Sequence, residues 1–121
     1  MRIFKHKSFH EWTKEEKLSD EVIKKAIAEM EEGLFEASLG SGLYKKRVAK
    51  SGRGKSGSYR TLVAFLVKEK AFFVYGFSKN NRSDINEKEK KIYRQLAKHF
   101  LGMTESEIQS MLINGKLYEV K

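Results

Sequence analysis

Lys45, Arg47 and Arg60 are the side chains of this sequence whose types and spacing best suit catalysis. Lys45 and Arg47 precede the glycine- and serine-rich stretch 51–60, SGRGKSGSYR, and Arg60 ends it. Side chains alternate along a strand, so Lys45 and Arg47 share one face if their segment is extended. If Arg60 joins them, the arginines can stabilise a pentacoordinate phosphate and favour the neutral form of the lysine, a candidate general base. The plainer alternative, which the charge pattern alone favours, is a set of solvent-facing cations that attract a nucleic acid backbone.

The positive charge is concentrated in one part of the chain. The 121 residues carry a formal net charge of +9, and residues 44–60 contain seven Lys/Arg and no Asp/Glu. Such a segment is the electrostatic footprint expected for a polyanion, most often nucleic acid. We therefore predict an RNA-binding set around it, in which glycines let the backbone approach phosphate and Tyr59 offers a ring for stacking. The set is Lys46, Lys50, Arg53, Lys55, Tyr59, Lys79 and Asn80.

The GRGKS sequence within this stretch resembles a nucleotide-binding P-loop, but the match fails. The first glycine of that motif would fall at position 49, which is alanine. A P-loop must also open a helix, whereas SYRTLVAF reads as a strand. The stretch is therefore predicted to be a loop between two strands.

The segments before residue 43 read as helices. Ser8 and Glu11 match a capping box and predict a helix over residues 8–17. Ser19 or Asp20 can cap a second helix, in which apolar residues recur at helical spacing. This pattern gives the second helix one face for packing.

Three strands should position the basic residues. Residues 43–49, 57–68 and 70–79 are rich in aromatic and β-branched residues and are separated by glycine-rich or charged turns. They predict three sequential antiparallel strands, with the second strand carrying Arg60 beside the first.

The C-terminal part returns to helical spacing. Ser83 or Asp84 is the expected N-cap of a long helix, Thr104 and Glu107 form a second capping box, and KLYEV is predicted to be an edge strand. The sequence thus predicts one α+β domain over residues 1–121: a small antiparallel sheet with N-terminal helices packed on it and C-terminal helices.

Several classes of function are disfavoured by composition. The chain has no cysteine, no apolar run of the roughly 20 residues that a membrane helix needs, and no recognisable secretory signal. His6 and His10 have ligand-like spacing but no evident third ligand. We expect a cytoplasmic protein without a metal or another cofactor.

The order LYKKR, GSYR and FVYGFSKNNR over residues 43–85 resembles the central sheet of the RelE/HigB toxins of bacterial type II toxin-antitoxin systems. This resemblance implies a RelE-like fold and a toxin that enters the ribosomal A site and cleaves translated messenger RNA. The substrate's own 2′-hydroxyl would be the nucleophile, without a metal. The implied partners are the ribosome, messenger RNA and an antitoxin, for example a helix-turn-helix DNA-binding protein like HigA.

The resemblance also implies roles for single residues. Lys45 matches a catalytic lysine, Arg47 replaces a second one, and Arg60 matches the arginine of the GYR motif. Asn80 stands where RelE has an arginine, which makes Arg82 the substitute catalytic cation. Asn86 stands where RelE has a tyrosine, so Lys79, Arg82 and Tyr59 remain open as leaving-group acids.

Two classes of function therefore remain. The first is a ribosome-dependent endoribonuclease toxin, which the clustered Lys45, Arg47 and Arg60 favour. The second is a protein that is not a ribonuclease, either a gyrase-directed toxin like ParE or a basic RNA-binding module.

Overall fold

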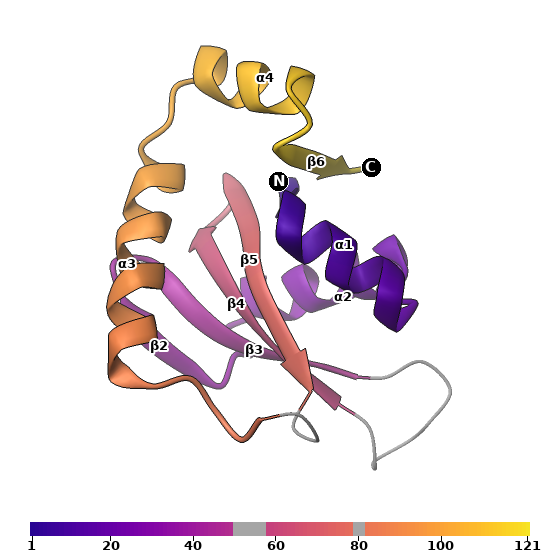
Figure 1. The fold of residues 1–121 in the computed structure, drawn as a ribbon, viewed down its shortest axis with the longest axis vertical. Helices are drawn as coiled ribbons and strands as arrows, with labels where there is room; N and C mark the ends of the chain where they lie inside the picture. The colour runs from indigo at the N-terminus through magenta and orange to yellow at the C-terminus, as the bar shows by residue number, and fades with distance from the viewer. Residues whose placement is uncertain (50–57, 79–81) are drawn as a thin grey trace.

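The chain folds around a six-stranded sheet that has helices on both faces (Figure 1). The computed structural model describes residues 1–49, 58–78 and 82–121. The helices in these residues are α1 (Lys7–Glu16), α2 (Asp20–Glu31), α3 (Glu87–Leu101) and α4 (Glu105–Ile113). The strands are β1 (Arg2–His6), β2 (Ala37–Gly40), β3 (Leu43–Ala49), β4 (Ser58–Leu66), β5 (Lys70–Ser78) and β6 (Leu117–Val120). None of these helices is long and apolar enough to cross a membrane.

The strand order is β2-β3-β4-β5-β1-β6, and the predicted antiparallel set β3, β4 and β5 forms its centre. The α+β class and the C-terminal edge strand are confirmed. One pairing differs from the predicted antiparallel arrangement: β1 pairs with β5 in parallel, with Phe4 beside Phe72. Neither β1 nor β2 was predicted, since each is short and becomes a strand by pairing with distant residues.

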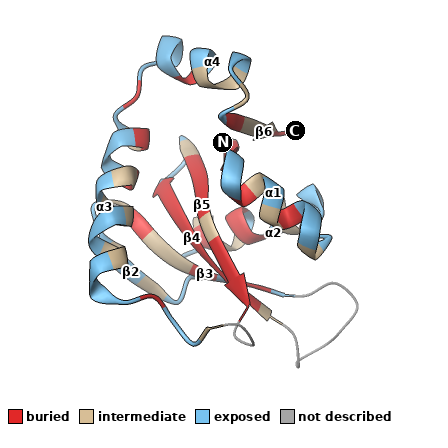
Figure 2. Cartoon of the chain, in the orientation of Figure 1, coloured by how far each residue is buried: buried red, intermediate tan, exposed pale blue. Residues whose placement is uncertain are grey.

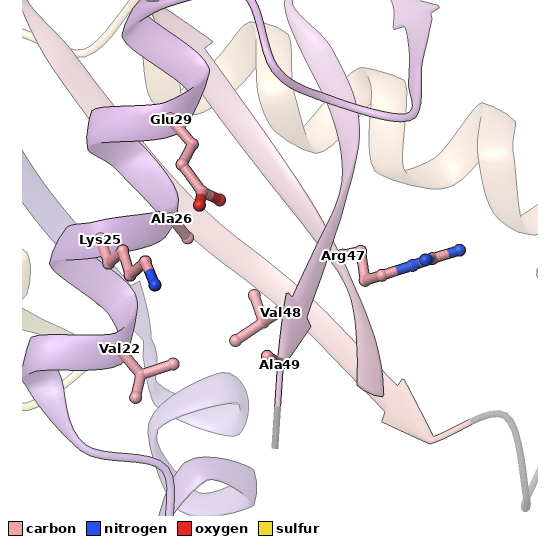
Figure 3. A pocket seen from close by; sticks show the side chains of 7 residues that line it. All are labelled: Val22, Lys25, Ala26, Glu29, Arg47, Val48 and Ala49. Carbon is pink, nitrogen blue, oxygen red and sulfur yellow. The ribbon is translucent and has the colours of Figure 1, made fainter. Parts of the chain in front are cut away.

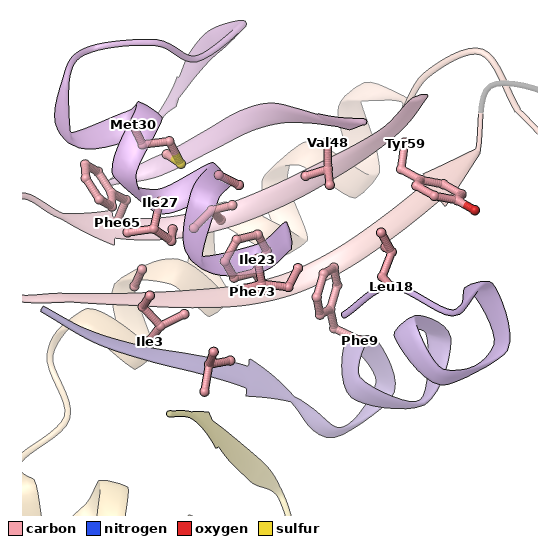
Figure 4. Close-up of a cluster of buried hydrophobic side chains, with 14 residues drawn as sticks. Ile3, Phe9, Leu18, Ile23, Ile27, Met30, Val48, Tyr59, Phe65 and Phe73 are labelled. Atoms are coloured by element: carbon pink, nitrogen blue, oxygen red, sulfur yellow. The ribbon is translucent and has the colours of Figure 1, made fainter. Parts of the chain in front are cut away.

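Each face of the sheet has its own hydrophobic cluster. Helices α1 and α2 cover one face, where Ile23, Ile27 and Phe73 are buried (Figure 4). Helix α3 covers the other face, where Leu43, Leu62 and other buried residues pack. Figure 2 shows that β4 and β5 are buried along most of their length, whereas β3 is only partly buried. Side chains that alternate along one strand therefore point to different helices.

Two of the predicted helix starts are wrong by a few residues. The N-cap of α1 is His6, whose ring nitrogen accepts from the backbone N–H of Ser8, instead of Ser8 itself. The N-cap of α3 is Asn86, instead of Ser83 or Asp84. The capping box of Thr104 and Glu107 at α4 is confirmed. The capping positions depend on where the preceding chain leaves the sheet, which local sequence does not specify.

Candidate functional site

Lys45, Arg47 and Arg60 lie on the same face of the sheet, at the end where β3 stops and β4 begins. Arg47 is directly opposite Arg60 in the β3–β4 register, and Lys45 is two residues away along β3. Figure 3 shows the side chain of Arg47 pointing away from α2, while Val48 points toward it. The predicted alternation of β3 is thus confirmed. These three residues are called the basic patch below.

Glu36, just before β2, holds the two arginines of the basic patch. Its carboxylate lies 3.1 Å from Nε of Arg60 and 3.9 Å from an Nη atom of Arg47. Its backbone N–H donates to the carbonyl of Lys45, which fixes it beside β3. The arginines differ in exposure, because the Arg60 side chain is 6% exposed and that of Arg47 is 58% exposed. Glu36 therefore fixes a buried guanidinium and leaves the other one accessible.

Asp84 pairs with the lysine of the basic patch. The ammonium of Lys45 donates to a carboxylate oxygen of Asp84 over 2.9 Å. This hydrogen bond lowers the pKa of Asp84 below its ordinary value. Lys45 and Asp84 thus form an ion pair at the edge of the basic patch.

Arg82 is held next to Asp84 by a two-pronged ion pair. Its Nη atoms donate to both carboxylate oxygens of Glu89, over 2.8 and 2.6 Å, and its Nε donates to the backbone carbonyl of Asp84. One Nη atom also donates to the hydroxyl of Tyr75. The Arg82 hydrogen bonds lower the pKa of Glu89 to about 2. Asp84 connects this fixed guanidinium to Lys45.

Asn86, which stands where the resemblance to RelE implies a tyrosine, has a structural role here. Its side chain accepts from the backbone N–H of Glu89, and its own backbone N–H donates to the Glu89 carboxylate. This capping box fixes the start of α3 and orients the carboxylate that binds Arg82. Asn86 therefore acts on the site through Glu89.

We expect the substitution Asn86→Ala to lower the free energy of unfolding by about 1 kcal/mol, the usual cost of losing an N-cap side chain. Urea denaturation measures this change. Lys88→Ala, an exposed position in the same helical turn, is the control and should be near neutral. Equal stability of the two variants would contradict the capping role of Asn86.

Two residues predicted to contact RNA lie on the opposite face, under the N-terminal helices. Lys46 is buried, and its ammonium lies 2.8 Å from the Glu29 carboxylate of α2. The Tyr59 ring is 4% exposed, packs edge-on against Trp12, and has its hydroxyl bonded to Glu16. The structure corrects both expectations for this conformation, because neither group faces the basic patch or offers a free surface.

Helix α2 and β3 also border a pocket of about 230 Å³ on this opposite face (Figure 3). Its walls include Val22, Ala26 and Val48, together with the charged Lys25 and Glu29. The Arg47 side chain points away from these residues in Figure 3. Arg47 also lines this pocket, so the pocket adjoins the basic patch at β3.

The remaining members of the predicted RNA-binding set lie outside the described residues: Lys50, Arg53, Lys55, Lys79 and Asn80. Their contacts stay predictions. Sequence reasoning also missed the three carboxylates of the site, Glu36, Asp84 and Glu89. No sequence signal singled them out, because none belongs to a catalytic motif.

The site as a whole contains four cations arranged around the end of the sheet, each held by a carboxylate. Fixed guanidinium groups of this kind stabilise negative charge on phosphate oxygens. Among the described residues, no three His, Asp or Glu side chains gather as a metal site. The available chemistry is therefore recognition and charge stabilisation of a phosphodiester by positive side chains.

Comparison with known families places residues 1–120 within one family model, described as the RelE toxin of the RelE / RelB toxin-antitoxin system. The chain belongs to the RelE toxin family. The match spans both faces of the sheet, and the α+β architecture agrees with it. No individual curated protein matches the chain. In this RelE family member, the basic patch occupies the strands that carry the LYKKR and GSYR motifs.

Proposed function

We propose that this RelE family toxin cleaves translated messenger RNA in the ribosomal A site and thereby inhibits translation. The observation that carries the proposal is the convergence of Lys45, Arg47 and Arg60 on one face, with Arg82 joined to them through Asp84. Four fixed positive charges at one end of a sheet suit the phosphate of a single-stranded RNA.

In the proposed reaction, the 2′-hydroxyl oxygen of the substrate attacks the adjacent phosphorus, and the 5′-oxygen of the next nucleotide leaves. The phosphorane that forms carries additional negative charge on its oxygens. Arg60 is the main stabiliser of this charge, because its guanidinium is buried and held by Glu36 and Ser58. Arg47 is exposed and clamps the phosphate on entry. No metal is required, since the substrate provides the nucleophile and the protein provides the positive charge.

Lys45 is proposed to act beside the attacking hydroxyl. Its ammonium, bonded to Asp84, cannot accept a proton while that ion pair is intact. A general-base role therefore requires that this ion pair opens when RNA binds. Arg82 follows β5 in the chain and is held by Glu89 and by the backbone carbonyl of Asp84. It is proposed to stabilise the leaving oxygen.

The proposed partners follow from this activity. The toxin would act in the cytoplasm, where ribosomes translate, and an antitoxin such as a HigA-like protein would inhibit it. The exposed Arg47 and the net charge of +9 support the binding of ribosomal and messenger RNA.

Brief induction of the toxin without an antitoxin tests the proposal. We expect translation to stop within minutes, and primer extension to map new 5′ ends inside translated codons. A transcript without a ribosome-binding site should remain intact and serves as the control. A DNA-damage response with continued translation would refute the ribonuclease proposal and favour a gyrase-directed toxin.

A further inference from the structure

A pocket of about 300 Å³ lies at the open edge of β5, next to the basic patch but outside it. Strand β1 pairs with β5 only from Lys70 to Phe73 and then turns into α1. Beyond Phe73, no strand of the described residues covers this edge of β5. The pocket occupies the uncovered edge, with lining residues from α1, β5 and α3.

The walls of this pocket are aromatic. Trp12 packs so closely on the backbone of Gly76 that a Cβ there would overlap the indole ring. Tyr75 and Tyr93 stack on each other, with ring centroids 5.3 Å apart and planes inclined by 22°. Trp12, Tyr75 and Tyr93 are each only partly buried, so part of every ring is accessible. Phe9 and Ser8 complete the lining.

The pocket is connected to Lys45 of the basic patch through Arg82 and Asp84. The hydroxyl of Tyr75 accepts a hydrogen bond from Arg82 over 3.2 Å. Tyr75 is paired with Leu62, and Phe77 is paired with Arg60, so Tyr75 lies on the face that carries the patch. Adjacent strands are about 4.8 Å apart, which places the edge of β5 within a few strand widths of Arg60. A nucleic acid strand crossing this end of the sheet would meet both features.

We propose that this aromatic pocket binds one nucleobase of the single-stranded RNA whose phosphate occupies the basic patch. The inference rests on the proposed function for the identity of the ligand and adds a base-binding subsite to it. Aromatic rings stack on every base, and the volume, at the small end for ligand pockets, suits a single ring system. An apolar side chain of a protein partner would fill the same space. The adjacent Arg82 and the net charge of +9 favour the polyanion.

Trp12 provides a direct test because it is the only tryptophan of the chain. Its fluorescence should change when a single-stranded RNA tetranucleotide is titrated up to millimolar concentration. A matched tetranucleotide with abasic residues keeps the phosphates and lacks the bases. We expect it to bind about tenfold more weakly and to leave the Trp12 emission unchanged. Equal affinity for both RNAs, or no Trp12 response to the base-containing RNA, would overturn the proposal.

Two variants test whether RNA binds in this pocket. Tyr93→Leu removes one ring of the pocket and Ser8→Leu adds an apolar side chain to its lining. Each should weaken binding of the base-containing RNA about tenfold. Tyr118→Leu is the matched control and should bind as the wild type does, because its ring is also partly buried and stacks on His10 outside the pocket. Thermal unfolding checks that each variant is folded. Unchanged RNA affinity in folded Tyr93→Leu and Ser8→Leu would also overturn the proposal.

The fluorescence titration tests the base-binding pocket, and the cleavage assay tests the ribonuclease activity. Either proposal can therefore be rejected while the other is retained. Messenger RNA cleavage without a Trp12 response to RNA would retain the proposed function and reject the base-binding pocket. A base-dependent Trp12 response without cleavage would reject the ribonuclease activity and retain the pocket. A Trp12 response to an antitoxin segment, with none to RNA, would assign the pocket to protein docking and overturn the proposal.

Discussion

Replacement of Arg60 by alanine is expected to slow the cleavage of ribosome-bound messenger RNA by about a hundred- to a thousand-fold. This is the usual effect of removing one fixed donor that stabilises transition-state charge. Arg60 fits that role because it is almost fully buried, is anchored by Glu36 and Ser58, and lies opposite Arg47. Single-turnover cleavage at saturating toxin measures the rate of the chemical step separately from binding.

Two further variants test this assignment. Arg60→Lys keeps the charge but loses the planar donor fork, so its rate should fall between those of the wild type and Arg60→Ala. Arg94→Ala is the control, because the Arg94 guanidinium also makes a hydrogen bond, to the backbone carbonyl of Leu39, but lies on α3 outside the basic patch. A folded Arg60→Ala variant that cleaves at the wild-type rate would show that the active site is elsewhere.

The carboxylates explain how such a concentration of charge is tolerated before RNA binds. Glu36 lies between two guanidinium groups, while Asp84 and Glu89 each accept from a separate cation. Without them, the like charges on β3 and β4 would repel each other across adjacent strands. A phosphate entering the patch offers the same type of acceptor as these carboxylates. Under the proposed function, RNA binding would exchange one set of ion pairs for another, with Glu36 competing for Arg47 and Arg60.

The parts of the fold that could be predicted are those in which local pattern and tertiary environment agree. Strands β3 and β5 have apolar residues on both faces and distinct turns, and α2 has one clear apolar stripe. The sequence RIFKH lacks such a signal because its five residues become a strand only through pairing with β5 and β6. The helix starts were misplaced for a related reason, since several polar residues near each start can act as a cap.

The site was predictable to the extent that alternation along a strand determines the direction of side chains. This rule correctly grouped Lys45 with Arg47 and placed Lys46 on the other face. It could not indicate that α2 buries Lys46, or that α1 covers Tyr59, because both contacts depend on how helices pack. The carboxylate partners of the proposed catalytic cations were missed for the same reason. Glu36 and Asp84 are distant from each other in sequence, and only folding brings them to the basic patch.

The substitution Phe72→Ala is expected to lower the free energy of unfolding by about 3–5 kcal/mol, the range found for large aromatic residues in cores. Phe72 is fully buried and stacks between Phe4 and Phe100, at centroid distances of 4.9 and 5.1 Å. The Phe72 ring therefore packs the paired strands β5 and β1 against α3. Urea denaturation followed by circular dichroism gives the change in free energy. A loss of this size is a large fraction of the stability of a small domain.

If Phe72→Ala is unfolded in buffer, Phe72→Leu is measured in its place. Leucine retains most of the apolar volume, so the loss in the free energy of unfolding should be smaller. Ile92→Ala is the control; it removes a large apolar side chain from α3 that is 56% exposed, and it should change stability by about 0.5 kcal/mol or less. If Phe72→Ala cost no more than Ile92→Ala, the three-ring stack would not be what holds α3 against the sheet. Because Glu89 at the start of α3 orients Arg82, weakening this stack should also reduce cleavage in a folded variant. The Phe72 side chain thus links the stability of the core to the geometry of the proposed active site.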